Sequence, residues 1–377
     1  MAGIYIHIPF CKQACSYCNF HFSTLTVHRD EMIKAILAEI EVRAHFFSDN
    51  TQLQSIYFGG GTPSILPVEA IQIILEKIYA TFSITENPEI TLEANPDDLS
   101  RAYLQQLKTE TKINRLSIGV QSFFEEDLHY MHRAHHALQA ETAIKNALDF
   151  GFSNLTVDLI YGVPTLSDEH WKKNIQLLLD FGIPHISAYA LTVEDKTMLK
   201  RHIQQHKKIA PEDDKAIRQY KLLIEQLEHA GFLHYEISNF AKLGFLAVHN
   251  SSYWDNTPYL GVGPSAHSYD GKNRFWNIAN NAQYMKAIAS GNLLFEKEVL
   301  SEQDFFNEYM MTKLRTQAGV STIDLQDRFG NMMTLHFLEN IQPYVQRNLV
   351  QVAQHNYRLT TEGKLLSDKI ISDLFLV

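Results

Sequence analysis

The sequence is poor in cysteine, in long apolar runs and in positive charge, and each shortage excludes a class of protein. Only three cysteines occur among 377 residues, all between positions 11 and 18, so no disulfide can join distant parts of the chain. No segment approaches the ~18 consecutive apolar residues of a membrane-spanning helix. With 33 Lys and Arg against 43 Asp and Glu, the net charge of −10 argues against a general nucleic-acid binder.

The first residues add a prediction about location. Met1 to Tyr5 carry neither a basic segment nor a long apolar stretch, so we expect no secretory signal peptide. Clustered, unpaired thiols favour a reducing compartment. We therefore expect a cytoplasmic protein without a membrane span, and peripheral contact with a membrane stays open, as does the oligomeric state.

Strand-like and helix-like segments alternate through residues 1–230 and predict an α/β fold. Six strands with crossovers of this length predict a parallel sheet curled into a partial (β/α)6 TIM-type barrel, with the active site at the carboxyl ends of its strands. The strands are predicted at 3–8, 55–58, 89–93, 115–120, 154–160 and 185–191. The helices are predicted at 27–47, 67–82, 100–108, 138–150, 167–181 and 211–230.

Two further segments follow the predicted barrel. Residues 231–300 are rich in aromatic residues and histidine, and we expect a loop-rich segment that forms a lid or a pocket wall. Residues 301–377 contain helix patterns at 302–315, 322–329 and 334–347, then two short strands and a last helix, which resembles a winged-helix domain. This domain has seven Lys and Arg against nine Asp and Glu, so we do not expect it to bind DNA.

The cysteines Cys11, Cys15 and Cys18 have the spacing C-x3-C-x2-C directly after the first predicted strand. Three buried core cysteines are one interpretation, but the polar residues between them indicate a loop. A zinc site would need a fourth ligand such as His7 or His21. Soft thiolates favour an iron–sulfur cluster, and three of them leave one iron of a [4Fe-4S] cube open for an external ligand.

This cysteine spacing, with an aromatic residue before Cys18, resembles the radical S-adenosylmethionine (SAM) superfamily. The resemblance implies that the amino and carboxylate groups of SAM chelate the open iron, and that one electron from the reduced cluster can cleave SAM to a 5′-deoxyadenosyl radical. A glycine motif follows the second predicted strand and resembles the superfamily's site for the amino end of SAM. Its central residues are Gly60, Gly61 and Thr62.

The resemblance narrows to the oxygen-independent coproporphyrinogen III oxidase group. It rests on Tyr5-x-His-Ile-Pro-Phe-Cys11, Gly-Gly-Gly-Thr-Pro at 59–63, Gly-Val-Gln-Ser-Phe at 119–123 and Asp-Leu-Ile-Tyr-Gly-Val-Pro at 158–164. It implies that five polar side chains line the SAM region, where carboxylates and an arginine can bind hydroxyl, ammonium and carboxylate groups. The matching residues are Tyr5, Glu93, Gln121, Arg133 and Asp158.

Two departures separate this chain from the oxidase proper. The oxidase has a fourth cysteine where this chain has Phe20, and it carries a segment before the cysteine loop that we do not expect here. Both features resemble the haem-chaperone branch of the family. That branch is linked to haem through a His-Asn-x-x-Tyr-Trp motif, present here from His249 to Trp254. Because histidine is a common axial ligand of haem iron, His249 is the candidate haem ligand. A packed aromatic loop is the structural alternative.

The resemblance therefore predicts a carrier that binds haem, a [4Fe-4S] cluster and SAM and delivers haem to acceptor proteins. The alternative is an oxygen-independent coproporphyrinogen III oxidase that decarboxylates a porphyrinogen by radical chemistry. Gly261 to His267 follow as a glycine-rich turn, either near SAM or purely structural. No residue can be assigned as catalytic from the sequence.

Overall fold

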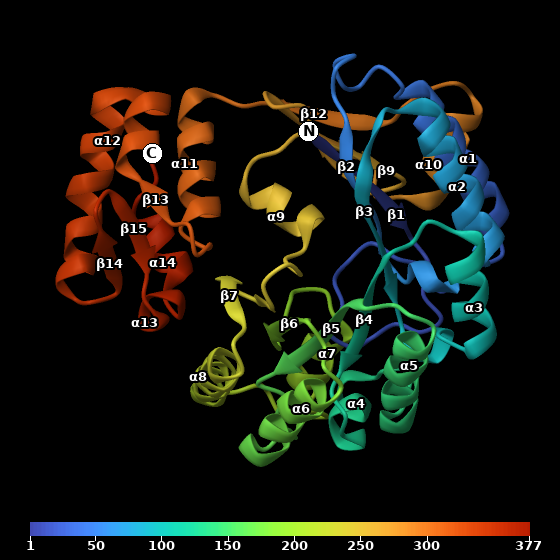
Figure 1. The fold of residues 1–377 in the computed structure, drawn as a ribbon, viewed down its shortest axis with the longest axis horizontal. Helices are drawn as coiled ribbons and strands as arrows, with labels where there is room; N and C mark the ends of the chain where they lie inside the picture. The colour runs from blue at the N-terminus through green and yellow to red at the C-terminus, as the bar shows by residue number, and fades with distance from the viewer.

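A computed structural model describes residues 1–377 and contains the predicted α/β core. Six parallel strands pair in chain order (Figure 1). They are β1 (Ala2–Ile8), β2 (Leu53–Gly60), β3 (Ile84–Ala94), β4 (Arg115–Gln121), β5 (Asn154–Tyr161) and β6 (His185–Ala190). The crossovers contain the predicted helices α1 (Arg29–Val42), α2 (Val68–Thr81), α3 (Arg101–Glu110), α5 (Ala137–Asp149) and α6 (Asp168–Asp180), and α8 (Asp213–His229) follows β6.

Within residues 1–230, two short helices were not predicted from the sequence. They are α4 (Glu125–Met131) and α7 (Met198–Gln204), seven residues each. So short a helix has too few turns to show an apolar period, and its stability comes from packing rather than propensity. Both helices lie in loops that follow strand carboxyl ends, β4 for α4 and β6 for α7.

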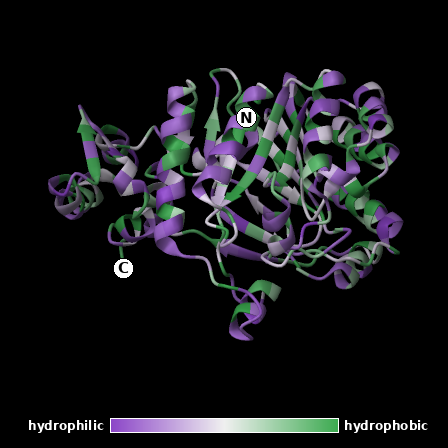
Figure 2. Ribbon diagram, turned by 90° about the horizontal axis from the view of Figure 1, so that it is seen from below, coloured by the Kyte–Doolittle hydropathy of each residue, from purple (hydrophilic) through white to green (hydrophobic).

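The core strands are buried on both faces, which is typical of a parallel sheet covered by helices. In β4, all seven residues are buried, and in β1 Ile4, Ile6 and Ile8 are at most 1% exposed. Figure 2 shows the apolar residues on the strands and on the inner faces of the surrounding helices. Ile8 pairs with Gly60 at the ends of β1 and β2, so the cysteine loop and the glycine motif leave the sheet side by side.

The segment at 231–300, where the sequence predicts many loops, also contains short strands and helices. This segment folds into β7 (Leu233–Glu236), β8 (Asn239–Ala241), α9 (Val248–Trp254), β9 (Tyr259–Val262), β10 (His267–Tyr269), β11 (Asn273–Asn277), α10 (Asn281–Ala289) and β12 (Phe295–Val299). Its strands extend both edges of an open sheet in the order β12-β11-β10-β9-β1-β2-β3-β4-β5-β6-β8-β7. Strands of three to five residues show too little alternation to predict, and their pairing partners are distant in sequence.

A buried carboxylate, Glu39 of α1, holds the β9 side of this extension. It accepts hydrogen bonds from the Gly263 backbone (2.8 Å), the Asn277 amide (2.7 Å) and the Tyr284 hydroxyl (2.6 Å). Burial raises the pKa of Glu39 in spite of these donors. The turn between Gly261 and His267 therefore has a structural role, because Gly263 has a φ of 102° and packs against the carbonyl of His7.

The C-terminal residues form a separate unit with its own core of 16 buried residues beside the barrel (Figures 1 and 2). It contains α11 (Glu302–Lys313), β13 (Val320–Ser321), α12 (Thr322–Gln346), β14 (Val350–Ala353), β15 (Asn356–Leu359), α13 (Thr361–Lys364) and α14 (Ser367–Ser372). Gly330, at a φ of 74° and ψ of −173°, breaks α12 between the two helices that the sequence predicts. No helix of the chain has both the length and the apolar character needed to cross a bilayer.

Candidate functional site

The cysteine loop lies at the carboxyl end of β1 and is held by backbone hydrogen bonds to three other segments. The Cys11 amide donates to the carbonyl of Ser23 (3.0 Å), and the Ser16 amide donates to the carbonyl of Met131 (3.0 Å). The Thr62 amide donates to the carbonyl of Phe10 (2.7 Å). The three thiols are free and partly buried. The fold therefore fixes the loop before any metal binds.

The glycines at the end of β2 serve packing as much as ligand access. A Cβ on Gly60 would lie 2.7 Å from the ring of His7, and one on Gly61 would lie 2.6 Å from the carbonyl oxygen of Phe10. Only glycine therefore lets this turn approach β1 and the cysteine loop. The turn carries Thr62, whose hydroxyl lies 3.5 Å from the Cys11 sulfur.

Arg133 follows α4 and bridges the cysteine loop to the sheet. Its Nη1 donates to the Cys15 sulfur and to the Tyr17 hydroxyl, both at 3.3 Å. Its Nη2 donates to the Asn95 amide oxygen (2.8 Å) and to the Gly119 carbonyl (2.7 Å). The arginine is thus a positioning group for the loop, with its Nε buried and unpaired.

A cavity of about 400 Å³, here called the outer cavity, opens beside the three cysteines. It gathers nearly all the residues that the resemblance assigns to the SAM region. Gln121 points into it because a β-bulge and a φ of 68° re-aim this side chain at the end of β4. The predicted residues along its wall are Cys11, Cys15, Cys18, Gly60, Gly61, Thr62, Glu93, Gln121, Arg133 and Asp158.

Two carboxylates stand at the inner end of this cavity. Burial, with a smaller contribution from nearby Asp158, raises the pKa of Glu93 to about 7, although the Tyr57 hydroxyl donates to its Oε1 at 2.7 Å. Burial also raises the pKa of Asp158 to about 6, although the Ser117 hydroxyl donates a hydrogen bond to this carboxylate at 3.3 Å. Both groups can therefore gain or lose a proton near neutral pH.

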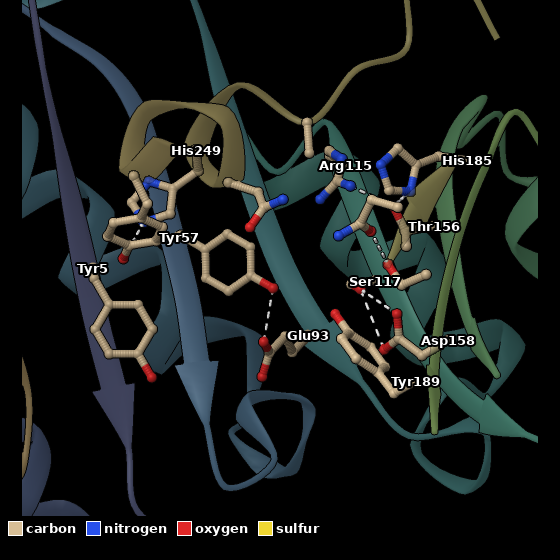
Figure 3. A pocket seen from close by; sticks show the side chains of 15 residues that line it. Tyr5, Tyr57, Glu93, Arg115, Ser117, Thr156, Asp158, His185, Tyr189 and His249 are labelled. Carbon is tan, nitrogen blue, oxygen red and sulfur yellow. Dashed lines mark hydrogen bonds between the residues drawn. The ribbon is translucent and has the colours of Figure 1, made fainter. Parts of the chain in front are cut away.

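A second cavity of about 240 Å³, here called the inner cavity, lies deeper in the barrel (Figure 3). It shares Glu93, Ser117, Asp158 and Tyr189 with the outer cavity, so the two adjoin. Tyr5 lines the inner cavity and not the outer one. Its hydroxyl lies 3.0 Å from Nδ1 of His7.

The candidate haem ligand His249 also lines the inner cavity. It is 1% exposed, its Nδ1 lies 2.8 Å from the Ser55 hydroxyl, and its Nε2 lies 3.0 Å from the Tyr253 hydroxyl. The ring stacks on Tyr57 at a centroid distance of 5.0 Å. Burial, with a smaller effect of Arg115, lowers the pKa of His249 to about 3. Both nitrogens of this neutral imidazole are engaged, so neither is free for iron here.

A buried ion pair holds α9, which carries His249, against the barrel. The carboxylate of Glu89 accepts from the amides of Val248 and His249, both at 2.9 Å. It also lies 3.7 Å from Nε of Arg115, whose side chain is 3% exposed. In Figure 3, α9 closes the side of the inner cavity opposite Glu93, and Arg115 lies next to His185 and Thr156.

The residues present fit an iron–sulfur cluster better than a zinc ion. No group of three or more His, Cys, Asp or Glu side chains is close enough together to hold a single ion. His7 cannot complete a zinc site, since its ring nitrogens contact the Tyr5 hydroxyl and the His21 carbonyl at 3.0 and 2.9 Å. Three thiols without a fourth protein ligand on one cavity wall suit a cluster with an open iron, and the adjoining polar cavity suits SAM.

Several residues of the two cavities were not predicted from the sequence. Asn95 follows β3 and joins Arg133 to Thr62, and its place in Ala-Asn-Pro after a strand was the available signal. Arg115, Thr156 and His185 come from the amino-terminal or middle parts of strands. Because site residues were sought from the sequence only at the carboxyl ends of strands, these three were not predicted.

Comparison with known proteins gives the family. The Radical SAM superfamily model matches residues 5–178, and the HemN C-terminal domain model matches residues 300–366. The chain is 32% identical over 374 residues to "Heme chaperone HemW" of Bacillus subtilis, covering 98% of both chains. It is 31% identical over 377 residues to the protein of that name from Mycobacterium tuberculosis, covering 99% of this chain and 94% of the other.

A mitochondrial relative and a solved structure agree with this result. "Radical S-adenosyl methionine domain-containing protein 1, mitochondrial" of Bos taurus is 30% identical over 387 residues and covers 99% of this chain and 87% of its own. The structure of Escherichia coli coproporphyrinogen III oxidase (HemN), a radical SAM enzyme, superposes on this chain with a TM-score of 0.85 at 22% identity. The alignment covers 99% of this chain and 90% of the other, so the two proteins share the fold.

Radical SAM membership implies a [4Fe-4S] cluster and SAM, for which the outer cavity provides the three thiols and the polar wall. The chain belongs to the radical SAM superfamily and, within it, to the HemW family of haem chaperones.

Proposed function

We propose that this protein is a haem chaperone that binds haem, together with a [4Fe-4S] cluster and SAM, and delivers the haem to acceptor proteins. The observation that carries the proposal is its full-length likeness, at 32% identity, to a relative named as a haem chaperone. Cys11, Cys15 and Cys18 hold the cluster in this proposal. The other predicted residues of the outer cavity, from Gly60 to Asp158, surround SAM.

Phe20 supports the carrier over the decarboxylating enzyme. It occupies the position where the oxidase resemblance places a fourth cysteine, and it is 70% exposed at the rim of the outer cavity. A phenyl ring cannot ligate a metal, but an exposed ring beside the cluster loop offers apolar contact to a flat ligand. The cluster and SAM, when bound, would supply one-electron chemistry at this rim.

His249 enters the proposal as a haem ligand only after α9 moves. Both of its ring nitrogens contact hydroxyl groups, and the inner cavity of about 240 Å³ lies below the usual ~300–1,000 Å³ of ligand pockets and is too small for haem. Release of Glu89 from the amides of Val248 and His249 would free the helix. We therefore propose that haem loading opens α9 and exposes His249.

Haem titration of anaerobic holoprotein tests this assignment with three variants. His249→Ala should weaken haem binding, and Glu89→Gln, which loosens α9, should load haem faster than the wild type. His267→Ala removes a histidine that lines neither cavity and should bind haem normally. Equal affinity in His249→Ala and the wild type would place the ligand elsewhere. Failure of the loaded wild type to pass haem to an apo-haem protein would contradict the carrier function.

The alternative is oxygen-independent coproporphyrinogen III oxidation, and the polar wall of the outer cavity favours it. Gln121, Glu93 and Asp158 around this cavity would hold SAM for radical chemistry, and a pure carrier has no evident need for such chemistry. An anaerobic assay with reductant, SAM and coproporphyrinogen III distinguishes the two functions. Formation of protoporphyrinogen would contradict the carrier-only function, and absence of turnover by protein that still transfers haem would exclude the enzyme.

A further inference from the structure

A basic segment beside the cysteine loop has no part in the proposed haem and SAM sites. Residues 196–208, which include α7, contain five lysines and arginines and no acidic residue, in a chain of net charge −10. They are Lys196, Lys200, Arg201, Lys207 and Lys208, and we call the segment the basic arm. Lys200 pairs with Asp195, whereas Arg201 and Lys207 are exposed and have no carboxylate partner.

The basic arm is anchored directly on the cysteine loop. The Leu199 amide donates to the Ser16 carbonyl at 2.6 Å, in the interval between Cys15 and Cys18. At the other end, the Lys208 ammonium contacts the Tyr130 carbonyl and lies 4.8 Å from the centroid of its ring. The Tyr130 hydroxyl in turn donates to the Ile209 carbonyl at 2.6 Å. The arm is thus held at both ends beside the loop that carries the cluster ligands.

The positive charges of the arm converge on one surface. Partial burial and the nearby cations of Lys208, Lys207 and Arg201, with His132 beyond them, lower the pKa of His202. Three basic side chains of the arm, together with His132 at the end of α4, therefore lie near His202. A concentrated charge of one sign steers a partner of opposite charge toward it.

We propose that the basic arm is the docking surface for an acidic one-electron carrier protein that reduces the cluster. The proposal rests on the cluster of the proposed function and not on its haem site. With three cysteines in all, the chain holds ligands for one cluster and for no second thiolate-bound centre, so the electron comes from outside. The carrier loses one electron and the cluster gains it, and no bond forms or breaks.

A nucleic acid would be the other polyanion to consider for this surface. The arm contains no phenylalanine, tyrosine or tryptophan to stack on bases, and the rest of the chain is acidic and would repel a long phosphate backbone. A compact acidic protein can contact the arm while avoiding the remaining surface. Location next to the cluster loop, rather than at the C-terminal unit, also favours electron delivery.

The experiment measures binding and cluster reduction with the holoprotein under anaerobic conditions. The probe is a purified FMN carrier of negative net charge, titrated by calorimetry at low and physiological ionic strength. Arg201→Glu with Lys207→Glu should weaken binding roughly tenfold or more at low salt and slow cluster reduction by the carrier. The matched control reverses two exposed lysines of α6, Lys172→Glu with Lys173→Glu, and should change the affinity less than about twofold.

Further measurements separate docking from folding and from haem transfer. Reduction by dithionite should proceed equally in both double variants, since a small reductant needs no docking surface. If charge reversal prevents folding, Arg201→Gln with Lys207→Gln provides the same test at smaller perturbation. Salt-independent binding, equal losses in the control, or tighter binding of tRNA through the same residues would overturn the proposal. If the protein still binds the electron carrier but does not transfer haem, the haem function is contradicted and the docking proposal is not.

Discussion

The side chains that define the site act mainly through hydrogen bonds that fix them before a ligand arrives. Glu93 accepts from Tyr57, and Arg133 makes four contacts across three segments. Such preorganisation reduces the ordering cost of binding. The resemblance assigned both residues to SAM, and the structure adds that Arg133 also supports the cysteine loop.

The buried carboxylate of Glu93 makes stability depend on pH. Its pKa of about 7 in the folded chain exceeds the ordinary value of 4.5, so the folded state holds the proton more tightly. Stability should therefore fall as pH rises from about 5 to about 8, by roughly 1–2 kcal/mol from this residue after screening. Urea unfolding of Glu93→Gln should show a smaller fall than the wild type. An identical pH slope in both would show that Glu93 ionises normally.

The substitution Arg133→Lys tests whether the hydrogen-bond geometry of the guanidinium matters beyond its positive charge. Lysine keeps the cation but cannot contact Cys15, Tyr17, Asn95 and Gly119 together, so we expect a loss of about 1–3 kcal/mol and slower cluster reconstitution. Iron content and visible absorbance measure the reconstitution. The exposed Arg101→Lys is the control. Normal reconstitution in Arg133→Lys would mean that the charge alone suffices.

At the scale of elements, the position of helix α9 depends on a carboxylate of strand β3. Glu89 at the buried part of β3 accepts from the first amides of α9 and neighbours Arg115. Seven residues form a weak helix by themselves, so this contact decides whether α9 stays against the barrel. The sequence predicted the motif on α9 but not its burial.

Glu89→Ala should destabilise the protein by about 3 kcal/mol, because it leaves Arg115 buried without its partner. Amide hydrogen exchange of residues 248–254 should rise more than that of β1 or β2. The exposed neighbour Glu86→Ala should affect neither quantity. Unchanged exchange in α9 would show that side-chain packing, not Glu89, holds the helix.

At the scale of the whole molecule, two separate cores divide the chain. One contains 62 buried residues of the barrel and its extensions, and the other contains the 16 of the C-terminal unit. The units meet through polar contacts such as Arg274 with Glu308 (2.7 Å) and Lys313 with Asp255 (2.6 Å). Interfaces of this kind permit partly independent unfolding.

Phe337→Ala should therefore destabilise the C-terminal unit without affecting the barrel. Phe337 is fully buried in the smaller core, and its truncation should cost about 3–5 kcal/mol. Hydrogen exchange should accelerate in β14 and β15, with β1 to β6 unchanged. Leu335→Ala on the same helix removes a side chain that is 47% exposed and serves as the control. Equal acceleration in β1 would show that the two cores unfold as one.

The sequence alone determined the features that depend on local chemistry. The spacing of Cys11, Cys15 and Cys18 predicted a loop for an iron–sulfur cluster, and the alternation of strands and helices predicted the α/β core, because both signals lie within short stretches of chain. The same holds for Phe20, whose side chain by itself excludes a fourth thiolate.

The tertiary structure decided what depends on neighbours distant in sequence. It placed Tyr5 in the inner cavity, extended the sheet with residues 231–300, and buried His249 between Ser55 and Tyr253. Burial and hydrogen-bond partners follow from which strands adjoin, and a single sequence carries no record of that pairing. Whether a histidine is free to bind iron is therefore a property of the fold.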